Sequence, residues 1–342
     1  MSELENDDDI LTDSQTELAM FILMLFVTPA ICIVGIVGNV CSILVLAKQG
    51  LKKCSNILLL GLAISDITYL IGYNNPPKIV YVVFGKQSFL YPPYSSTILF
   101  VLSEIFLMID YSSGLASLTL PMLITIERLV TVFFPLKVSR IITPQRTVAA
   151  VSCVFIFWYS NFIYPLFWFE LSNEYNASQN KTVYVIVRSA LFQKDKHAIR
   201  PFEEAWAYFS VKIPATFTFI GCVIIGIKVK MVGMKRKLMT GKEIKGSMNR
   251  TTKTLLAVCG VYTVTCAVTS LTVFIPEYVS FSISEDRTTN LRLVTYQLMS
   301  TLVCVNSSCN FVIYIVCNKN FRDAYKALFI KTIRIDLPMK KR

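Results

Sequence analysis

The sequence predicts an all-α membrane protein: a seven-transmembrane helix bundle, followed by a short amphipathic helix on the cytoplasmic side. Of the 342 residues, 54% are hydrophobic and only 16% are charged, and the mean hydropathy is +0.55. A soluble domain carries roughly 25% charged residues. The apolar residues also gather in long runs that short basic segments separate. A chain of this composition buries much of its surface in lipid.

Each long apolar run is able to cross a bilayer, whose ~30 Å core needs about 20 apolar residues per helix. The predicted spans cover residues 19–47, 55–84, 97–133, 147–170, 202–231, 253–280 and 291–317. Prolines such as Pro214 are compatible with these helices, because neighbouring helices satisfy the carbonyl groups that a proline leaves free.

The distribution of charge predicts the orientation of the chain. Residues 1–18 contain acidic side chains and no lysine or arginine, whereas basic residues gather in the segments 48–53, 137–146 and 228–250 and in the last residues. Lysine and arginine favour the cytoplasmic side. We therefore expect an extracellular acidic tail (1–18), a seven-transmembrane domain (19–317) and a cytoplasmic segment (318–342) in a plasma-membrane protein.

Two shorter features fit this orientation. Asn176-Ala-Ser and Asn180-Lys-Thr are glycosylation sequons in a segment that the charge pattern places outside. Residues 318–330 space Phe321, Ala324 and Leu328 among basic residues, which is typical of an amphipathic helix on membrane lipids. The ten cysteines all fall in the predicted spans or near the cytoplasmic side, where we expect them to pack as small apolar residues.

A series of short motifs follows the predicted spans in order. These are Gly38-Asn39-Val40, Leu62-Ala63-Ile64-Ser65-Asp66, Glu127-Arg128-Leu129, Trp158, Pro214 and Asn310-Phe311-Val312-Ile313-Tyr314. Their order and spacing resemble the rhodopsin-like (class A) G-protein-coupled receptors over the whole chain. The segment 135–144, taken with Lys48-Gln49-Gly50, is similar to invertebrate orphan receptors of the chemosensory and neuropeptide types.

The resemblance implies a sodium ion in the middle of the bundle. The matching positions all offer oxygen atoms, which suit a hard cation, and they are Asp66, Ser117, Asn306, Ser307 and Asn310. A bare carboxylate at this depth is costly unless it is paired or neutralised. A hydrogen-bonded network around a protonated Asp66 is the alternative.

The resemblance also implies a ligand pocket around Asp110, which matches the position where some receptors hold a ligand cation. Asp110 and Ser117 lie seven residues apart and so share a helix face. Further candidate contacts are Glu104, Tyr111, Trp206 and Ser210. Two other interpretations remain open: Lys212 pairs internally with Asp110 or Glu104, and the aromatic residues are packing or interfacial residues.

A third set of residues is predicted to bind a heterotrimeric G protein. It comprises Glu127, Arg128, Pro135, Leu136 and Tyr314, together with the basic segment 228–250. That segment is also explained by orientation and by anionic lipid. Asn249 stands where an acidic partner of the arginine is often found, which predicts a weaker resting lock.

Several positions depart from the family pattern. Ser103 stands where a cysteine usually bridges to the second outer loop, and the predicted loop 171–201 has no cysteine. Span six has Cys266-Ala267-Val268-Thr269 in place of Cys-Trp-x-Pro, Phe311 replaces a proline and Cys222 replaces a tyrosine. The usual switching steps of the family therefore lack their residues.

These observations favour a receptor that binds an extracellular ligand, most simply a cationic peptide, and activates G proteins. The alternatives are a chemosensory receptor for a small molecule or biogenic amine, a membrane protein that binds without signalling, and a transporter or channel with a polar path. The single histidine, His197, and the lack of catalytic motifs argue against an enzyme, and no cofactor other than sodium is implied. The scattered basic residues argue against a nucleic-acid partner.

Overall fold

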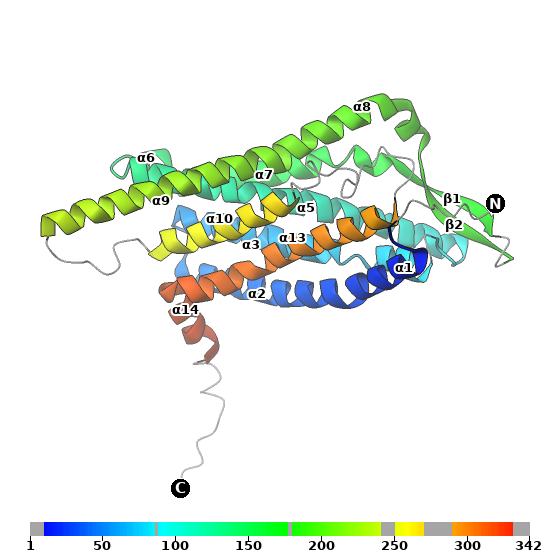
Figure 1. Cartoon of the computed structure of the whole chain (residues 1–342), viewed down its shortest axis with the longest axis horizontal. Helices are drawn as coiled ribbons and strands as arrows, with labels where there is room; N and C mark the ends of the chain where they lie inside the picture. Colours follow the sequence, from blue (N-terminus) through cyan, green and yellow to red (C-terminus); the bar gives the residue numbers. More distant parts are fainter. Residues whose placement is uncertain (1–9, 86–87, 177–179, 241–249, 270–288, 331–342) are drawn as a thin grey trace, which may run out of the picture.

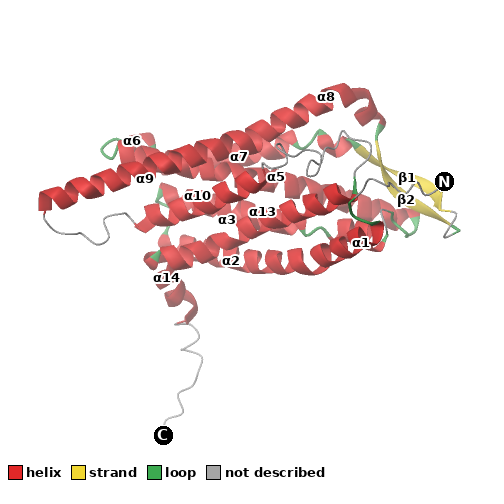
Figure 2. Cartoon of the chain, viewed as in Figure 1, coloured by secondary structure: helices red, strands yellow, loops and turns green. Residues whose placement is uncertain are grey.

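The computed structural model describes residues 10–85, 88–176, 180–240, 250–269 and 289–330. Long helices lie side by side in a bundle, and a single hairpin stands at one end (Figures 1 and 2). The helices α6 and α14 lie at the opposite end, and we refer to the two as the hairpin end and the α14 end.

The helices follow the predicted spans closely. Spans one and two are formed by α1 (Asp13–Ile22), η1 (Leu23–Val27), α2 (Thr28–Gln49), α3 (Cys54–Tyr73), α4 (Pro76–Ile79) and η2 (Val80–Phe84). Spans three and four are α5 (Pro93–Phe133) and α7 (Pro144–Asn161), with α6 (Val138–Ile141) between them and η3 (Pro165–Phe167) after them. The later spans are α8 (Ala190–Ala207), η4 (Tyr208–Lys212) and α9 (Ile213–Thr240), then α10 (Arg250–Thr269) and α13 (Asn290–Cys317).

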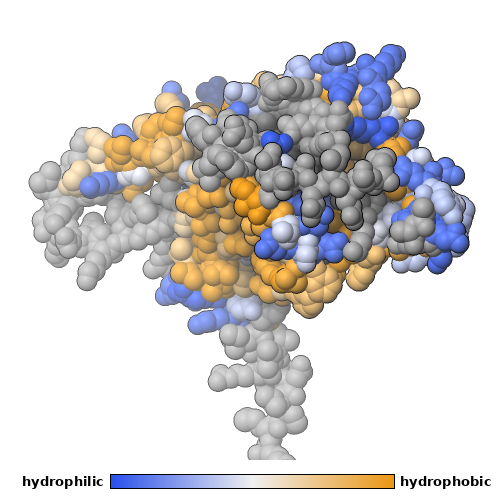
Figure 3. Space-filling view, turned by 45° about the vertical axis from the view of Figure 1, so that its right-hand side comes forward, coloured by the Kyte–Doolittle hydropathy of each residue, from blue (hydrophilic) through white to orange (hydrophobic). Residues whose placement is uncertain are grey.

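The seven-helix fold predicted from the sequence is confirmed. Within the described residues, six helical spans are long and apolar enough to cross a membrane, and α10 contributes a shorter apolar stretch, Ala257–Val268. The rest of predicted span six, to residue 280, lies outside the described residues. Apolar side chains cover much of the visible bundle surface, and hydrophilic ones gather towards its ends (Figure 3).

The predicted short helix after the seventh span is present as α14 (Lys319–Tyr325) and η5 (Lys326–Ile330). Asn318 caps it by accepting a hydrogen bond from the backbone N–H of Phe321. The Phe321 ring is buried, with its centroid 5.4 Å from that of Tyr314. One apolar face of the helix is thereby fixed to the bundle core.

The predicted outer loop 171–201 is wrong in its extent. Strands β1 (Phe169–Asn176) and β2 (Lys181–Arg188) form an antiparallel hairpin, and α8 then runs on into span five, so His197 lies in a helix rather than in a loop. The buried side chains of Trp168, Phe192 and Ile199 form a small core that stabilises this helix. Polar residues between those apolar ones lower the average hydropathy and hide the helix from a search for apolar runs.

The hairpin is attached to the bundle by hydrogen bonds. The N–H of Phe89 donates to the carbonyl oxygen of Tyr184 over 2.7 Å, and the N–H of Ile186 donates to the Tyr81 hydroxyl over 3.0 Å. The Tyr81 and Phe89 rings lie 4.8 Å apart. None of the ten cysteines forms a disulfide. These contacts fix the hairpin where the receptors that the sequence resembles commonly use a disulfide.

Helices α3 and α5 approach each other very closely at Gly72. A Cβ atom on Gly72 would lie 2.5 Å from the backbone nitrogen of Asp110. No side chain fits there without a shift of one helix, so glycine allows the backbone of Asp110 to pack against α3. The close approach positions Asp110 next to the end of α3.

Candidate functional site

Asp66 is fully buried where α3, α5 and α13 meet. The Ser117 hydroxyl donates to Oδ1 of Asp66 over 2.6 Å, and Nδ2 of Asn310 donates to Oδ2 over 2.7 Å. Each carboxylate oxygen therefore has a partner from a different helix. The structure brings together three of the residues predicted for the ion site.

Two further buried side-chain oxygen atoms in this part of the bundle have no hydrogen-bond partner among the described residues. The Ser307 hydroxyl lies beside the carboxylate, but it makes no hydrogen bond of normal geometry, and Oδ1 of Asn39 is also buried without one. Asn39 itself is fixed by its Nδ2, which donates to the Ser307 carbonyl over 2.9 Å. Buried oxygens without donors suit a cation. Asn306 is buried, but its side chain does not bond to Asp66.

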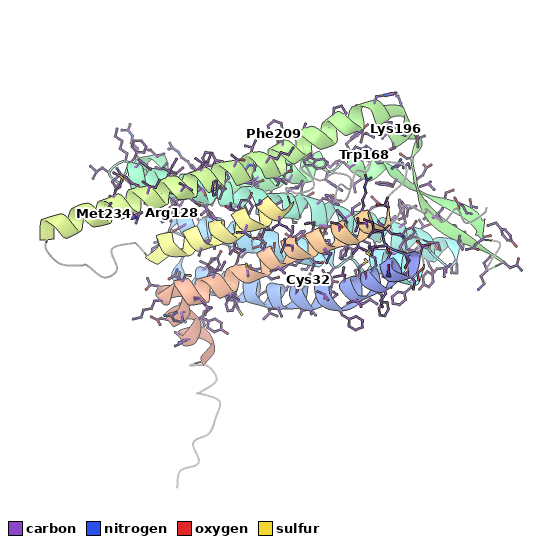
Figure 4. The ribbon with its side chains drawn as sticks, in the orientation of Figure 1. Cys32, Arg128, Trp168, Lys196, Phe209 and Met234 are labelled. Atoms are coloured by element: carbon purple, nitrogen blue, oxygen red, sulfur yellow. The ribbon has the colours of Figure 1, made fainter. Side chains whose placement is uncertain are left out.

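Glu127 and Arg128 form a buried ion pair near the end of α5 that lies towards the α14 end of the bundle. Nη2 of Arg128 donates to Oε1 of Glu127 over 2.9 Å, and Nε lies 2.5 Å from Oε2. Their side chains are only 7% and 11% exposed. Figure 4 shows Arg128 towards the α14 end and Trp168 towards the hairpin end.

The other residues predicted for coupling divide into two groups. Leu136 is 96% exposed and Pro135 is also exposed, so both are available to a partner. Tyr314 is buried in the core, and its hydroxyl has no hydrogen-bond partner among the residues that the structure describes. Asn249, the position of the predicted weaker lock, lies outside the described residues.

Asp110 is buried towards the hairpin end, and its carboxylate has no hydrogen bond or ion pair to any residue that the structure describes. The neighbouring Tyr111 hydroxyl bonds to that of Tyr296 over 3.0 Å, and the Tyr111 ring stacks on Phe162 at 5.4 Å. The Phe162 ring lies 6.0 Å from that of Trp206. Tyr111 and Trp206 are thus joined through one aromatic row.

The remaining predicted ligand contacts are less directly connected to Asp110. Ser210 is buried in η4. Oε2 of Glu104 is buried and has no hydrogen-bond partner in the described structure. Neither residue has a contact with Asp110 that defines a common pocket.

The interpretation that Lys212 pairs with Asp110 or Glu104 is wrong. Nζ of Lys212 lies 3.6 Å from the Tyr208 ring centroid and forms no ion pair with Asp110 or Glu104. The cation whose field acts on Asp110 is Lys78, a residue that the sequence reasoning missed. The sequence alone could have indicated Lys78, because it is the one lysine within predicted span two. Charged residues within membrane spans are usually functional.

A comparison with known protein families identifies the family of this chain. The model of the seven-transmembrane receptors of the rhodopsin family matches residues 38–314. The chain belongs to the rhodopsin family. This membership confirms the resemblance to class A receptors and the multi-pass membrane architecture, in a family of receptors rather than enzymes.

Individual relatives come from invertebrates. The rhodopsin-family chain is 26% identical over 309 residues to the FMRFamide receptor of Drosophila melanogaster, with 87% of this chain and 52% of the relative covered. It is 23% identical over 322 residues to a probable G-protein-coupled receptor of Caenorhabditis elegans, covering 89% and 68% of the two chains. A galanin-like receptor of that nematode is 23% identical over 156 residues, covering 46% and 33%. The chain thus spans about half the length of the Drosophila relative.

Proposed function

We propose that this rhodopsin-family receptor binds a cationic peptide from the extracellular side and activates heterotrimeric G proteins. The observation that carries the ligand proposal is the buried, unpaired carboxylate of Asp110, close to the side chains of Tyr69, Tyr73 and Tyr111. A partly dehydrated carboxylate attracts a cation more strongly than one in water. The aromatic rings nearby add cation–π surface for a guanidinium or ammonium group.

The names of two relatives support a peptide. One is called an FMRFamide receptor, a name that spells the tetrapeptide Phe-Met-Arg-Phe with an amide end, and another is called galanin-like. The arginine of that tetrapeptide offers the cation that Asp110 lacks. Tyr111 and Trp206 would then contact the ligand, with Glu104 and Ser210 nearer its periphery.

The coupling proposal rests on the ion pair of Glu127 and Arg128 and on the exposed Leu136. The pair holds Arg128 within the bundle, and breaking it would free a guanidinium group to contact a G protein. Pro135 and Leu136 offer an apolar contact next to it. Tyr314 would leave its buried position in the same change. An agonist drives this change only if it binds the active form better than the resting form.

A sodium ion at Asp66 is proposed as a stabiliser of the resting form. Ser117, Ser307 and Asn310 would hold it together with Asp66, and the unpartnered oxygens of Ser307 and Asn39 support this fit. The ion would neutralise a carboxylate that is otherwise buried in a region of low dielectric constant. Asn306 would take part only after its side chain turned towards Asp66.

The proposed orientation has the hairpin end outside the cell at the plasma membrane and the α14 end in the cytoplasm. Asn176 and Asn180 flank the tip of the hairpin, and we propose that both are glycosylated there. The basic residues Lys137, Arg140 and Arg146 lie around α6 at the other end (Figure 1).

Guanine-nucleotide exchange on a panel of purified G proteins tests the coupling proposal without a ligand. We expect the wild-type receptor to drive basal exchange on at least one G protein, Arg128→Ala to abolish it and Leu136→Ala to reduce it. Exposed Leu136 has no packing role, so its variant separates loss of a contact from loss of the fold. Exchange that is unchanged in both variants at matched expression would contradict the proposal.

A further inference from the structure

Two cysteine thiols meet where the helices α5, α9 and α10 pack together. The thiol of Cys222 on α9 interacts with that of Cys259 on α10. The sulfur of Cys259 also lies 3.7 Å from the hydroxyl oxygen of Thr125 on α5. The two thiols therefore join two different helices, and a third helix holds one of them in place.

Close packing fixes the position of this thiol pair. A Cβ atom on Gly221, the residue next to Cys222, would clash with Cγ2 of Thr125, so glycine allows α9 to approach α5 closely. The side chains of Thr125 and Cys259 are buried, whereas that of Cys222 is only half-buried. A small uncharged oxidant can thus reach Cys222, and the partner thiol is already beside it.

The thiol pair also lies next to Arg128, the residue proposed to drive coupling. Thr125 precedes Arg128 by about one turn of α5, or ~4.5 Å along the helix axis, and the charge of Arg128 acts on the Cys259 thiol. Arg128 is only 6% exposed, and both α9 and α10 pack against its helix. A partner reaches Arg128 only when the surrounding helices move apart. A covalent bond between α9 and α10 would oppose that movement.

We infer that Cys222 and Cys259 form a reversible disulfide when hydrogen peroxide oxidises them, and that this bond holds the receptor in its resting form. The sulfur of Cys222 attacks one peroxide oxygen, which gives a sulfenic acid and one water molecule. The sulfur of Cys259 then attacks the sulfenic sulfur, so that the S–S bond forms and the hydroxyl group leaves as a second water molecule. The two thiols together lose two electrons and two protons, and the peroxide is reduced to water.

A small-molecule thiol reverses the reaction by thiol–disulfide exchange. Disulfides on the cytosolic side of a cell are usually transient and often sense the redox state, which agrees with a bond that forms only under oxidation. The effect of the disulfide on the resting form rests on the proposed coupling function. Its formation depends only on the geometry of the two cysteines.

A second thiol pair in the bundle provides an internal control. Cys32 on α2 and Cys304 on α13 also interact, and both are fully buried. The Cys304 thiol donates to the Tyr69 hydroxyl over 3.8 Å. The two pairs have the same chemistry but differ in access, because neither thiol of this second pair is exposed. We expect peroxide to link Cys222 to Cys259 and to leave Cys32 and Cys304 reduced.

The test treats the purified full-length receptor with hydrogen peroxide and then alkylates the remaining thiols. Mass spectrometry of the digested protein should find Cys222 linked to Cys259, and dithiothreitol should remove the link. Because a cross-link restricts the unfolded chain, oxidation should raise the thermal unfolding midpoint of the wild type but not that of Cys222→Ser. Cys32→Ser should respond as the wild type does. Basal nucleotide exchange should fall at least about fivefold on oxidation, the lower end of typical coupling between two sites, and should recover with dithiothreitol.

Two free thiols after oxidation, two separate higher oxides, or a link between Cys32 and Cys304 instead would overturn the proposed disulfide. A disulfide that forms but leaves basal exchange unchanged would overturn its effect on the resting form. A receptor without basal exchange on any G protein would contradict the coupling proposal and, with it, that effect. The linked peptide and the unfolding midpoint would still decide whether the disulfide forms, since neither measurement needs a G protein.

Discussion

Two groups of ionisable side chains within the bundle differ in whether the protein provides them with a partner. Asp66 has a donor on each oxygen, and Arg128 is paired with its neighbour Glu127. Asp110, Glu104 and Lys78, towards the hairpin end, have no hydrogen bond or ion pair through their charged groups within the described structure. Asp66, Glu127 and Arg128 are thus satisfied by the protein, whereas Asp110, Glu104 and Lys78 have no direct partner in the part of the chain that the structure describes.

This difference indicates which charged groups stabilise the fold and which are free to bind another molecule. Burying an unpaired charge opposes folding, so a chain retains such a charge only where something compensates for it. A ligand cation compensates for Asp110 in the proposed function. The paired groups instead hold one conformation until binding shifts the equilibrium between two states.

The largest effect is expected from breaking the Glu127–Arg128 pair. Glu127→Ala leaves a buried guanidinium without its partner, which typically costs about 3–5 kcal/mol. We expect a large fall in the thermal unfolding midpoint of the purified receptor and a rise in basal nucleotide exchange. Glu127→Gln retains a hydrogen-bond acceptor and should fall between this variant and the wild type. An unchanged midpoint in Glu127→Ala would show that the pair does not stabilise the resting form.

A somewhat smaller effect is expected at the contact between α3 and α5. Gly72→Ala places a methyl group 2.5 Å from the backbone nitrogen of Asp110. Overpacking of this kind costs about 1–3 kcal/mol, and the shift of Asp110 should also weaken peptide binding. Gly226→Ala on α9 is the control, because no atom lies within 4 Å of the added group. Equal midpoints for the two variants would contradict the close approach.

The sodium proposal predicts a stabilisation that depends on the cation. Replacing choline chloride by sodium chloride at equal ionic strength should stabilise the wild type by about 1 kcal/mol when sodium exceeds its dissociation constant several-fold. Asp66→Asn and Ser307→Ala should lose this response in thermal unfolding. Asn306→Ala should keep it, because Asn306 does not bond to Asp66. Identical midpoints in the two salts would instead favour the hydrogen-bonded network alone.

The smallest effect is expected at the hairpin, which neutral contacts hold. Tyr81→Phe removes the hydroxyl that accepts a hydrogen bond from Ile186. One such bond contributes about 1 kcal/mol, so amide hydrogen exchange should accelerate in β2 while the unfolding midpoint changes little. Tyr94→Phe, at an exposed position, is the control. Unaltered exchange at Ile186 would mean that other contacts fix the hairpin.

The positions of the residues around Asp66 were more predictable from the sequence than those near the hairpin end. Asp66, Ser117 and Asn310 lie on regular helices whose phase follows from residue spacing, and they meet as expected. The helix phase restarts at Asn75, where Pro76 and Pro77 begin α4, so counting from Asp66 does not locate Lys78. The hairpin was missed because its residues do not alternate cleanly between buried and exposed.

The central claim is that Asp110 binds the ligand while Arg128 drives coupling, and one paired experiment tests it directly. Binding of Phe-Met-Arg-Phe and basal nucleotide exchange are measured on the wild type, Asp110→Asn and Arg128→Ala at matched expression. We predict that Asp110→Asn loses peptide binding but keeps basal exchange, and that Arg128→Ala keeps binding but loses exchange. Loss of the same property in both variants, or of neither property in either, would contradict the account.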